Sequence, residues 1–178
     1  MANKSIPRIE GILLYYTKAL GADYNAYRNH VYRVYHLTLL LHHDELNYPA
    51  SETLAVAAAF HDLGIWTHNT LDYLEPSADL ASEYLRENNS TELDEAVRSL
   101  IIMHHKLGIH KDNALAEAFR KADKMDLSFG FFNYKLPKSR YAHLKEEFPF
   151  LEFQKNIIRK VLRYALTHLN RPFPMLRR

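Results

Sequence analysis

The sequence places a histidine and an aspartate side by side, His61 and Asp62, directly after the alanine-rich apolar stretch of residues 54–60. Alanine and leucine favour helix, and small side chains let other helices approach closely, so this stretch predicts a helix through the middle of the fold. Gly64 follows at a position where a glycine commonly ends a helix. Because a titratable pair is costly to bury unless it is paired or bound to a metal, His61 and Asp62 are the first candidates for a metal site.

The helix predicted over residues 25–43 carries a histidine, His30, on its apolar face. Taken alone, a single histidine on such a face is more often a hydrogen-bonded core residue than a ligand. His36, His42 and His43 of the same helix lie off the apolar face or at its end, and we expect them on the surface. His30 is therefore a metal-ligand candidate only if other parts of the chain supply partners.

Two later helices supply such partners. His104 and His105 follow the apolar positions of a helix that is predicted to end near Lys106. Asp123 lies on the apolar side of the helix predicted over residues 113–127, where an acid would be costly to bury without a partner. These positions join His30 and the His61-Asp62 doublet as candidates for one shared site.

Helical periodicity accounts for nearly the whole chain, and the alternation of period two that would predict strands is absent. Ser51 and Ser77 stand where helix N-cap residues are expected, and the segments 64–76 and 128–138 are predicted to be loops. We therefore predict an all-α fold, a helical bundle with the candidate site between its central helices. The predicted helices span residues 7–20, 25–43, 52–62, 77–88, 91–106, 113–127, 139–147 and 150–169.

A chain of 178 residues is long enough for one domain with a sizeable core. We predict a single domain over residues 1–178, with a core at about 25–127 on which C-terminal helices at 139–170 pack. The net charge of +2 gives no case for nucleic-acid binding. The arginine-rich end, from Arg171 onward, is expected to be a solvated tail.

The chain contains no cysteine, which excludes disulfides, thiol catalysis and cysteine-based zinc sites. Its first residues hold too short an apolar run for a signal peptide, and no stretch approaches the roughly 20 apolar residues of a membrane helix. We expect a cytoplasmic protein without a membrane partner.

The ordered set of His30, His61-Asp62 and Asp123, with an Ile-x-x-His-His run that ends at His105, resembles the HD-domain superfamily of metal-dependent phosphohydrolases. The resemblance covers most of the chain. It implies that His30, His61, Asp62 and Asp123 are the four ligands of one divalent metal ion. The residue types agree, because imidazole nitrogen and carboxylate oxygen suit Mn, Fe, Co, Ni or Zn better than Ca, and Mg stays among the candidate ions.

The resemblance further implies hydrolysis of a phosphate ester or anhydride by a metal-activated water. The substrate would be a small-molecule phosphate compound, with nucleotides among the candidates. Asp62 would be a ligand that also orients the water, while His104, His105 and Lys106 would donate to the phosphate or protonate the leaving oxygen. Further candidate substrate contacts follow the last ligand in the sequence: Lys124, Asp126 and Asn133.

Superfamily members that hold a second metal carry additional histidines between the doublet and the last aspartate. The pair His104-His105 matches the later of these positions, but the intermediate histidine, expected four residues before a serine, is missing. Tyr73 stands there instead, four residues before Ser77, with Asp72 and Glu75 close by as substitute oxygen ligands. We therefore predict one tightly held metal.

Two other classes of function remain as alternatives. A diiron oxygenase of the inositol-oxygenase type would need two irons, and a noncatalytic HD module would bind a nucleotide without hydrolysing it. Aromatic residues around the predicted loops would suit stacking on a nucleobase, although they would pack equally well onto the core. These residues are Trp66, Tyr73, Phe129, Phe131, Phe132 and Tyr134.

Overall fold

The computed structural model describes residues 5–42 and 45–176, which form helices joined by loops and turns and so confirm the predicted all-α class. The helices are α1 (Pro7–Tyr15), α2 (Thr17–Leu20), α3 (Tyr24–His42), α4 (Tyr48–Phe60), α5 (Gly64–Thr67), α6 (Leu74–Glu87), α7 (Asp94–Met103), α8 (Ala114–Leu127), α9 (Lys138–Glu147) and α10 (Phe153–Thr167). Two short 3-10 turns, η1 (Gly21–Asp23) and η2 (Thr91–Leu93), precede α3 and α7. His43 lies outside the described residues.

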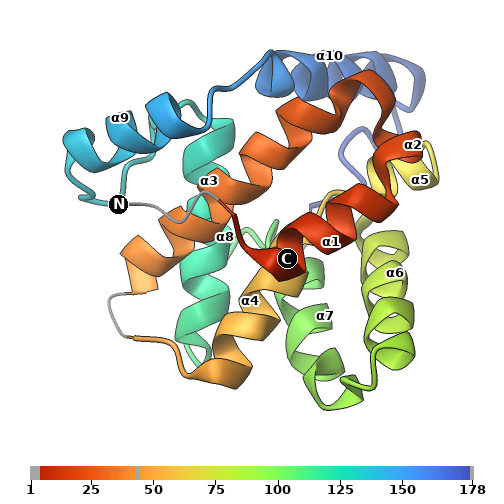
Figure 1. Cartoon of the computed structure of the whole chain (residues 1–178). Helices are drawn as coiled ribbons and strands as arrows, with labels where there is room; N and C mark the ends of the chain where they lie inside the picture. The colour runs from red at the N-terminus through yellow and green to blue at the C-terminus, as the bar shows by residue number, and fades with distance from the viewer. Residues whose placement is uncertain (1–4, 43–44, 177–178) are drawn as a thin grey trace.

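Helices α3, α4 and α8 form the centre of the fold. Helix α3 packs along α8, and α4 packs against α3 on one side and α7 on the other. Helices α6 and α7 form an adjacent pair at the lower right of Figure 1, and α9 and α10 lie across α3 at the top. None of the helices within the described residues has both the length and the apolarity that crossing a membrane requires.

Helix α4 is central because its residues from Thr53 to Phe60 are all buried, which the small alanine side chains permit. Its N-cap is Asn47, whose side-chain oxygen accepts a hydrogen bond from the Ala50 amide at 3.0 Å. The prediction of Ser51 as the N-cap was therefore wrong, since the helix begins a full turn earlier.

The prediction that Gly64 ends a helix was wrong, because Gly64 is the first residue of α5 and has no positive φ. A glycine is needed here because neighbouring atoms leave no room for a side chain. A Cβ atom at this position would lie 2.7 Å from the Tyr73 carbonyl oxygen and 2.9 Å from Ser77 Oγ. Ser77 is likewise not an N-cap, since α6 begins at Leu74; its hydroxyl accepts a hydrogen bond from the Gly64 amide at 2.9 Å.

Helices α9 and α10 close over α3 through the loop that joins them. Asn29 and Arg33 of α3 donate hydrogen bonds to the Pro149 and Phe148 carbonyl oxygens at 2.8 and 2.7 Å. His36 lies under the same loop, stacked near Phe148 and buried. The prediction that His36 is a surface residue was wrong because the covering segment follows it in sequence by more than a hundred residues.

The prediction of a solvated tail from Arg171 onward was wrong for the described residues, which extend to residue 176. Met175 is buried in the hydrophobic core, and Arg171 forms an ion pair with Asp72 at 3.2 Å. The segment therefore folds back onto the loop that precedes α6.

The contact at Gly64 yields a stability prediction. We expect Gly64→Ala to lower the free energy of unfolding by about 1–3 kcal/mol, since the added methyl group must displace Tyr73 backbone and Ser77. Urea denaturation followed by circular dichroism measures this change. The matched control is Gly11→Ala in α1, where no atom lies within 4 Å of the new Cβ, and where alanine should stabilise the helix by roughly 0.5–1 kcal/mol. Equal effects at both positions would contradict the steric explanation.

Candidate metal centre

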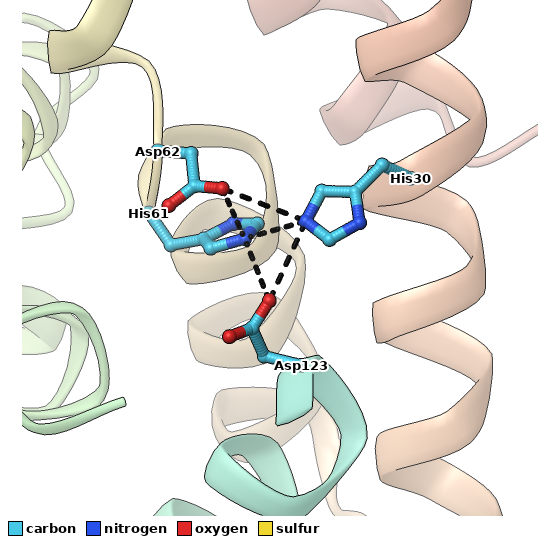
Figure 2. Close-up of side chains that lie close together, drawn as sticks. All are labelled: His30, His61, Asp62 and Asp123. Atoms are coloured by element: carbon cyan, nitrogen blue, oxygen red, sulfur yellow. Dashed lines mark hydrogen bonds and ion pairs between the residues drawn. The ribbon is translucent and has the colours of Figure 1, made fainter. Parts of the chain in front are cut away.

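Four predicted ligands converge from three central helices, as Figure 2 shows. His30 points inward from α3, His61 and Asp62 lie in the turn that follows α4, and Asp123 points inward from α8. All four side chains are buried, and one ligand atom from each lies within 4.8 Å of the others. The ordered pattern in the sequence therefore corresponds to one cluster in space.

The distances within this cluster are those expected around a shared ion. His30 Nε2 lies 3.1 Å from His61 Nε2, 3.6 Å from Asp62 Oδ2 and 3.5 Å from Asp123 Oδ1. His61 Nε2 lies 3.5 and 3.8 Å from the same two carboxylate oxygens. Ligands that are each about 2.1 Å from one ion are separated by roughly 3 to 3.5 Å. The four residues present thus fit a divalent metal ion.

The second ring nitrogen of each histidine is already occupied, which fixes the direction of the first. His61 Nδ1 lies 2.8 Å from the Ala58 carbonyl oxygen, an acceptor, and so carries the proton. His30 Nδ1 lies 2.8 Å from Asp126 Oδ2 and donates to it. As a result, both Nε2 lone pairs face the centre of the cluster, as in metal-binding histidines whose other nitrogen is hydrogen-bonded.

His104 repeats this arrangement at the end of α7. Its Nδ1 lies 2.6 Å from the Ile101 carbonyl oxygen, three residues earlier, as His61 Nδ1 does with Ala58. Its Nε2 lies 3.5 Å from Asp62 Oδ1 and has no hydrogen-bond partner among the described residues. Two apolar helices, α4 and α7, therefore end on a histidine that turns a lone pair toward Asp62.

The cluster contains acceptors without matching donors. Asp62 Oδ1 and both oxygens of Asp123 are buried and have no hydrogen-bond partner among the described residues. Buried polar groups are normally paired, because each unpaired group loses its hydration without compensation. Two carboxylates and several imidazole lone pairs around one point are best satisfied by a cation.

Electrostatics around the cluster favour positive charge. Burial lowers the pKa of His30, but the hydrogen bond to Asp126 and the nearby Asp62 outweigh it and raise the pKa to about 9. Burial opposes ionisation of Asp62, yet His61 and His104 hold its pKa well below the usual range. The same charge that draws a proton onto His30 would draw a metal ion into the cluster.

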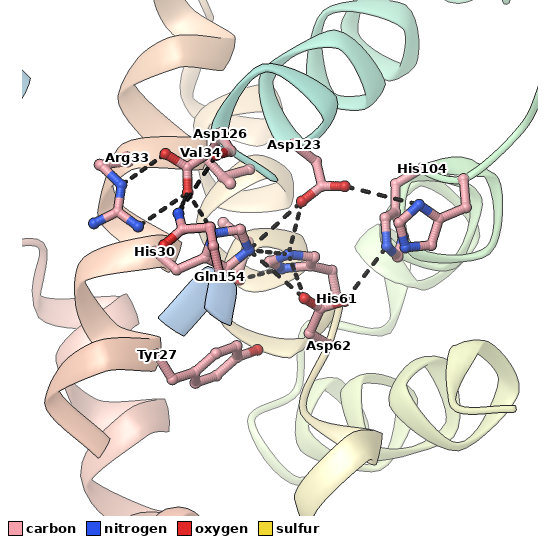
Figure 3. A network of polar contacts seen from close by, with 12 residues as sticks. Tyr27, His30, Arg33, Val34, His61, Asp62, His104, Asp123, Asp126 and Gln154 are labelled. Atoms are coloured by element: carbon pink, nitrogen blue, oxygen red, sulfur yellow. Dashed lines mark hydrogen bonds and ion pairs between the residues drawn. The ribbon is translucent and has the colours of Figure 1, made fainter. Parts of the chain in front are cut away.

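Behind His30 lies a second carboxylate, Asp126, which Figure 3 places between His30 and Arg33. Arg33 Nε and Nη2 donate to its two oxygens at 2.7 and 2.9 Å, and Gln154 Nε2 from α10 donates at 2.9 Å. Burial raises the pKa of Asp126, but Arg33 and His30 outweigh it and hold it at about 2. Asp126 was predicted as a substrate contact, which is wrong, because it is fully buried and orients His30.

His105 differs from His104 because its Nε2 is hydrogen-bonded to the buried Tyr73 hydroxyl at 2.6 Å. Burial and the neighbouring His104 lower its pKa to about 4, so the ring is neutral. Its Nδ1 lies 3.8 Å from Asp123 Oδ2. His105 therefore presents Nδ1 to the cluster, whereas His104 presents Nε2.

The substitute oxygen ligands considered for a second metal point elsewhere. Asp72 pairs with Arg171, and Glu75 pairs with Arg98 at 3.1 Å on the surface. The residue between them in sequence, Tyr73, points inward to His105 instead. A second group that could hold an ion nevertheless exists beside the first, formed by Asp62, His104 and His105.

A pocket of about 340 Å³ opens beside the cluster, with His104, His105 and Asp123 at one end. Three cationic side chains line it, Lys106 from the loop after α7 and Arg120 and Lys124 from α8. The position of Lys106 and Lys124 agrees with their predicted proximity to the site, and Arg120 is an addition that the sequence analysis missed. Its signal was available, because it lies one turn before Asp123 on the same helix face.

The aromatic set splits into separate groups. Trp66 packs against Tyr27 and donates from Nε1 to Asp23 at 2.9 Å, so it is part of the core wall. Phe129, Phe131 and Phe132 are exposed, and Lys124 Nζ lies 4.3 Å from the centre of the Phe132 ring. Asn133 accepts a hydrogen bond from the Lys135 amide in a local turn and does not line the pocket.

The role of Asp126 predicts a change in metal affinity. We expect Asp126→Asn to weaken binding of a divalent ion by about 10–100-fold, because the His30 ring loses the charged acceptor that orients it. Isothermal titration calorimetry with Mn²⁺ or Zn²⁺ measures the affinity, at a temperature where circular dichroism reports folded protein. Tyr141→Phe is the control, since it removes only a long 3.3 Å hydrogen bond to the same carboxylate. An unchanged affinity in Asp126→Asn would refute the orienting role.

Glu117 predicts a dependence of stability on pH. It holds the loop between α7 and α8 by accepting from Arg120 at 2.7 and 2.9 Å and from the His110 amide at 3.1 Å. Burial raises the pKa of Glu117, but these donors outweigh it and hold the pKa at about 2. Its stabilising contribution is present in full above the ordinary carboxyl pKa near 4.5 and is lost as the pH falls toward about 2. The difference in unfolding free energy between the native chain and Glu117→Gln should therefore shrink between pH 6 and pH 3, and a constant difference would contradict this pairing.

Comparison with known proteins agrees with the geometry. The family model of the HD domain matches residues 27–128, which include all four predicted ligands and both residues of the His104-His105 pair. No curated protein and no solved structure matches the chain. The match spans more than half of the sequence and contains the helices that build the buried cluster, so the chain belongs to the HD-domain family.

Proposed function

We propose that this chain is a metal-dependent phosphohydrolase that acts on a small phosphate compound. The observation that carries the proposal is the buried cluster of acceptors, with unpartnered oxygens of Asp62 and Asp123, beside a pocket with three cationic side chains. A cation at the cluster would balance the carboxylates, and an anion in the pocket would balance the cationic side chains. A phosphoryl group is an anion that a metal ion and basic side chains hold in common.

His30, His61, Asp62 and Asp123 would hold a divalent ion, for which Mn, Fe, Co, Ni, Zn and Mg are the candidates. Such an ion, when bound, lowers the pKa of water and polarises a phosphoryl oxygen. Asp62 faces both the cluster and His104, so its second oxygen is placed to accept a hydrogen bond from an incoming water.

The pocket residues would bind the phosphate, and Lys106 would supply a proton to the leaving oxygen. Lys106 and Lys124 would neutralise the phosphate oxygens, whereas the charge of Arg120 is already balanced by Glu117. The ring of His105 is neutral and Tyr73 engages its Nε2, so its Nδ1 would form a hydrogen bond with the substrate or with the attacking water. His104 turns a lone pair toward Asp62 and belongs with the ligands rather than with the donors.

The size and charge of the pocket favour a compact substrate. A volume of about 340 Å³ suits a phosphomonoester or a mononucleotide better than a polymer. Leu127 and Leu176 line the pocket along with the cations, so an apolar or planar group next to the phosphate would find contacts.

A second candidate function follows from the group Asp62, His104 and His105, which could hold another ion next to the first. Two irons there would support an oxygenase of the inositol-oxygenase type. The hydrogen bond between Tyr73 and His105 Nε2 leaves Nδ1 as the nitrogen that would bind such an ion.

Metal content and phosphatase activity test the proposal together. We expect about one divalent ion per chain in the purified protein and hydrolysis of some members of a broad panel of phosphomonoesters and nucleotides. Asp123→Asn keeps the shape of the side chain and removes one ligand charge, so it should lose the ion and lower the rate on the order of a thousandfold. His143→Asn is the matched control, since this exposed histidine of α9 lies outside the cluster and the pocket.

The outcomes separate the alternatives. Two irons per chain with oxygen consumption would favour the oxygenase. A folded chain that holds no metal and binds a nucleotide would favour a noncatalytic module. Metal-loaded protein without hydrolysis of any compound in the panel would refute the phosphohydrolase.

A further inference from the structure

A second cavity is separate from the pocket beside the cluster and is larger than it. This cavity measures about 620 Å³ and lies between α10 and the segment from α5 to Leu71. None of its lining residues lines the pocket next to Asp123. The function proposed above therefore makes no use of it.

One wall of this cavity is cationic. Arg159, Lys160 and Arg163 line it from one stretch of α10, and none of them forms an ion pair with another described residue. The carboxylate in the wall, Asp23, is already engaged, since it accepts from Trp66 Nε1 at 2.9 Å and from Asn156 Nδ2 at 3.4 Å. The cavity therefore carries excess positive charge, and an anion of several charges would balance it.

The opposite wall is apolar, and the cationic wall also carries an aromatic ring. Ile65 and Leu71 are buried and contribute apolar surface. Tyr164 stands on α10 beside the cations, with its ring stacked on His168 at a centroid distance of 3.9 Å and an interplanar angle of 2°. A ring held in this way is a rigid platform on which a planar group can pack.

From these features we propose that the cavity binds a nucleoside polyphosphate at a site separate from the metal centre. The volume lies in the range of small-molecule sites, and three cations match the charge of a di- or triphosphate chain. Tyr164, Ile65 and Leu71 supply the contacts for the nucleoside. Free polyphosphate shares the charged part of this chemistry, and the experiment below distinguishes the two.

The site is separated from the metal centre by a layer of aromatic rings. Lys160 Nζ lies 5.2 Å from the centre of the Trp66 ring, and Trp66 packs on Phe153 with centroids 6.3 Å apart. Phe153 in turn stacks on His30 at 4.1 Å. An occupant would thus be held by the same helix that covers His30, while remaining outside the pocket that Lys106 lines.

Calorimetry with soluble probes tests the site independently of hydrolysis. The probes are adenosine 5′-(β,γ-imido)triphosphate, inorganic tripolyphosphate, inorganic phosphate and adenosine. We expect the imidotriphosphate to bind most tightly and phosphate and adenosine to bind weakly. Arg163→Glu should weaken imidotriphosphate binding by about tenfold or more, because it places a negative charge in the cationic wall.

The matched control is Lys155→Glu, which makes the same charge change on the same helix outside the cavity. We expect it to change affinity by less than about twofold. Tyr164→Ala should weaken binding of the imidotriphosphate and leave that of tripolyphosphate unchanged, since only the nucleoside uses the ring. Circular dichroism establishes that each variant is folded.

Three results would overturn the proposal. The first is the absence of imidotriphosphate binding, or binding that Arg163→Glu leaves unchanged. The second is an affinity for tripolyphosphate equal to that for the imidotriphosphate, which would show that the nucleoside contributes nothing to binding. The third is binding of anionic phospholipid vesicles, but not of the soluble probes, through the exposed apolar residues Ile158, Leu162 and Leu166 that adjoin the cations on α10.

Discussion

The structure depends on burying two carboxylates and two imidazole rings around one point, where a proton or a metal ion must supply positive charge. His30, His61, Asp62 and Asp123 meet at one point, and the ring nitrogens that could donate are committed to the Ala58 carbonyl oxygen and to Asp126. Such a cluster repels itself unless a positive charge occupies it. Helices α4 and α8 orient the two histidines through Ala58 and Asp126, and α10 covers His30 with Phe153.

Two devices keep the cluster in place. The first is the shared design of α4 and α7, each of which ends on a histidine whose Nδ1 is fixed by the carbonyl three residues earlier. The second is the buried pair of Asp126 and Arg33, whose charges compensate one another behind His30. Because removal of one partner would leave the other buried and uncompensated, this pair couples metal affinity to the stability of the helix pair α3 and α8.

Charge is divided between the centre and its surroundings. The centre is acidic, while both cavities are lined by cations, Lys106, Arg120 and Lys124 in one and the α10 residues in the other. The net charge of the chain, +2, conceals this division because the opposite charges nearly cancel. Anionic ligands are therefore favoured at specific places on a molecule whose overall charge is almost neutral.

The sequence by itself determined the all-α class through its apolar periodicity, and it singled out the clustered residues through polar groups on apolar faces and the ordered pattern that resembles HD domains. Tertiary structure decided which side chains are buried and which partners they contact. His36 is buried by a loop far along the chain, Asp126 faces Arg33 rather than a substrate, and Gly64 is required by the approach of Tyr73 and Ser77. Each of these outcomes arises from contacts between distant segments, and the direction and partners of a side chain there depend on packing that no local pattern encodes.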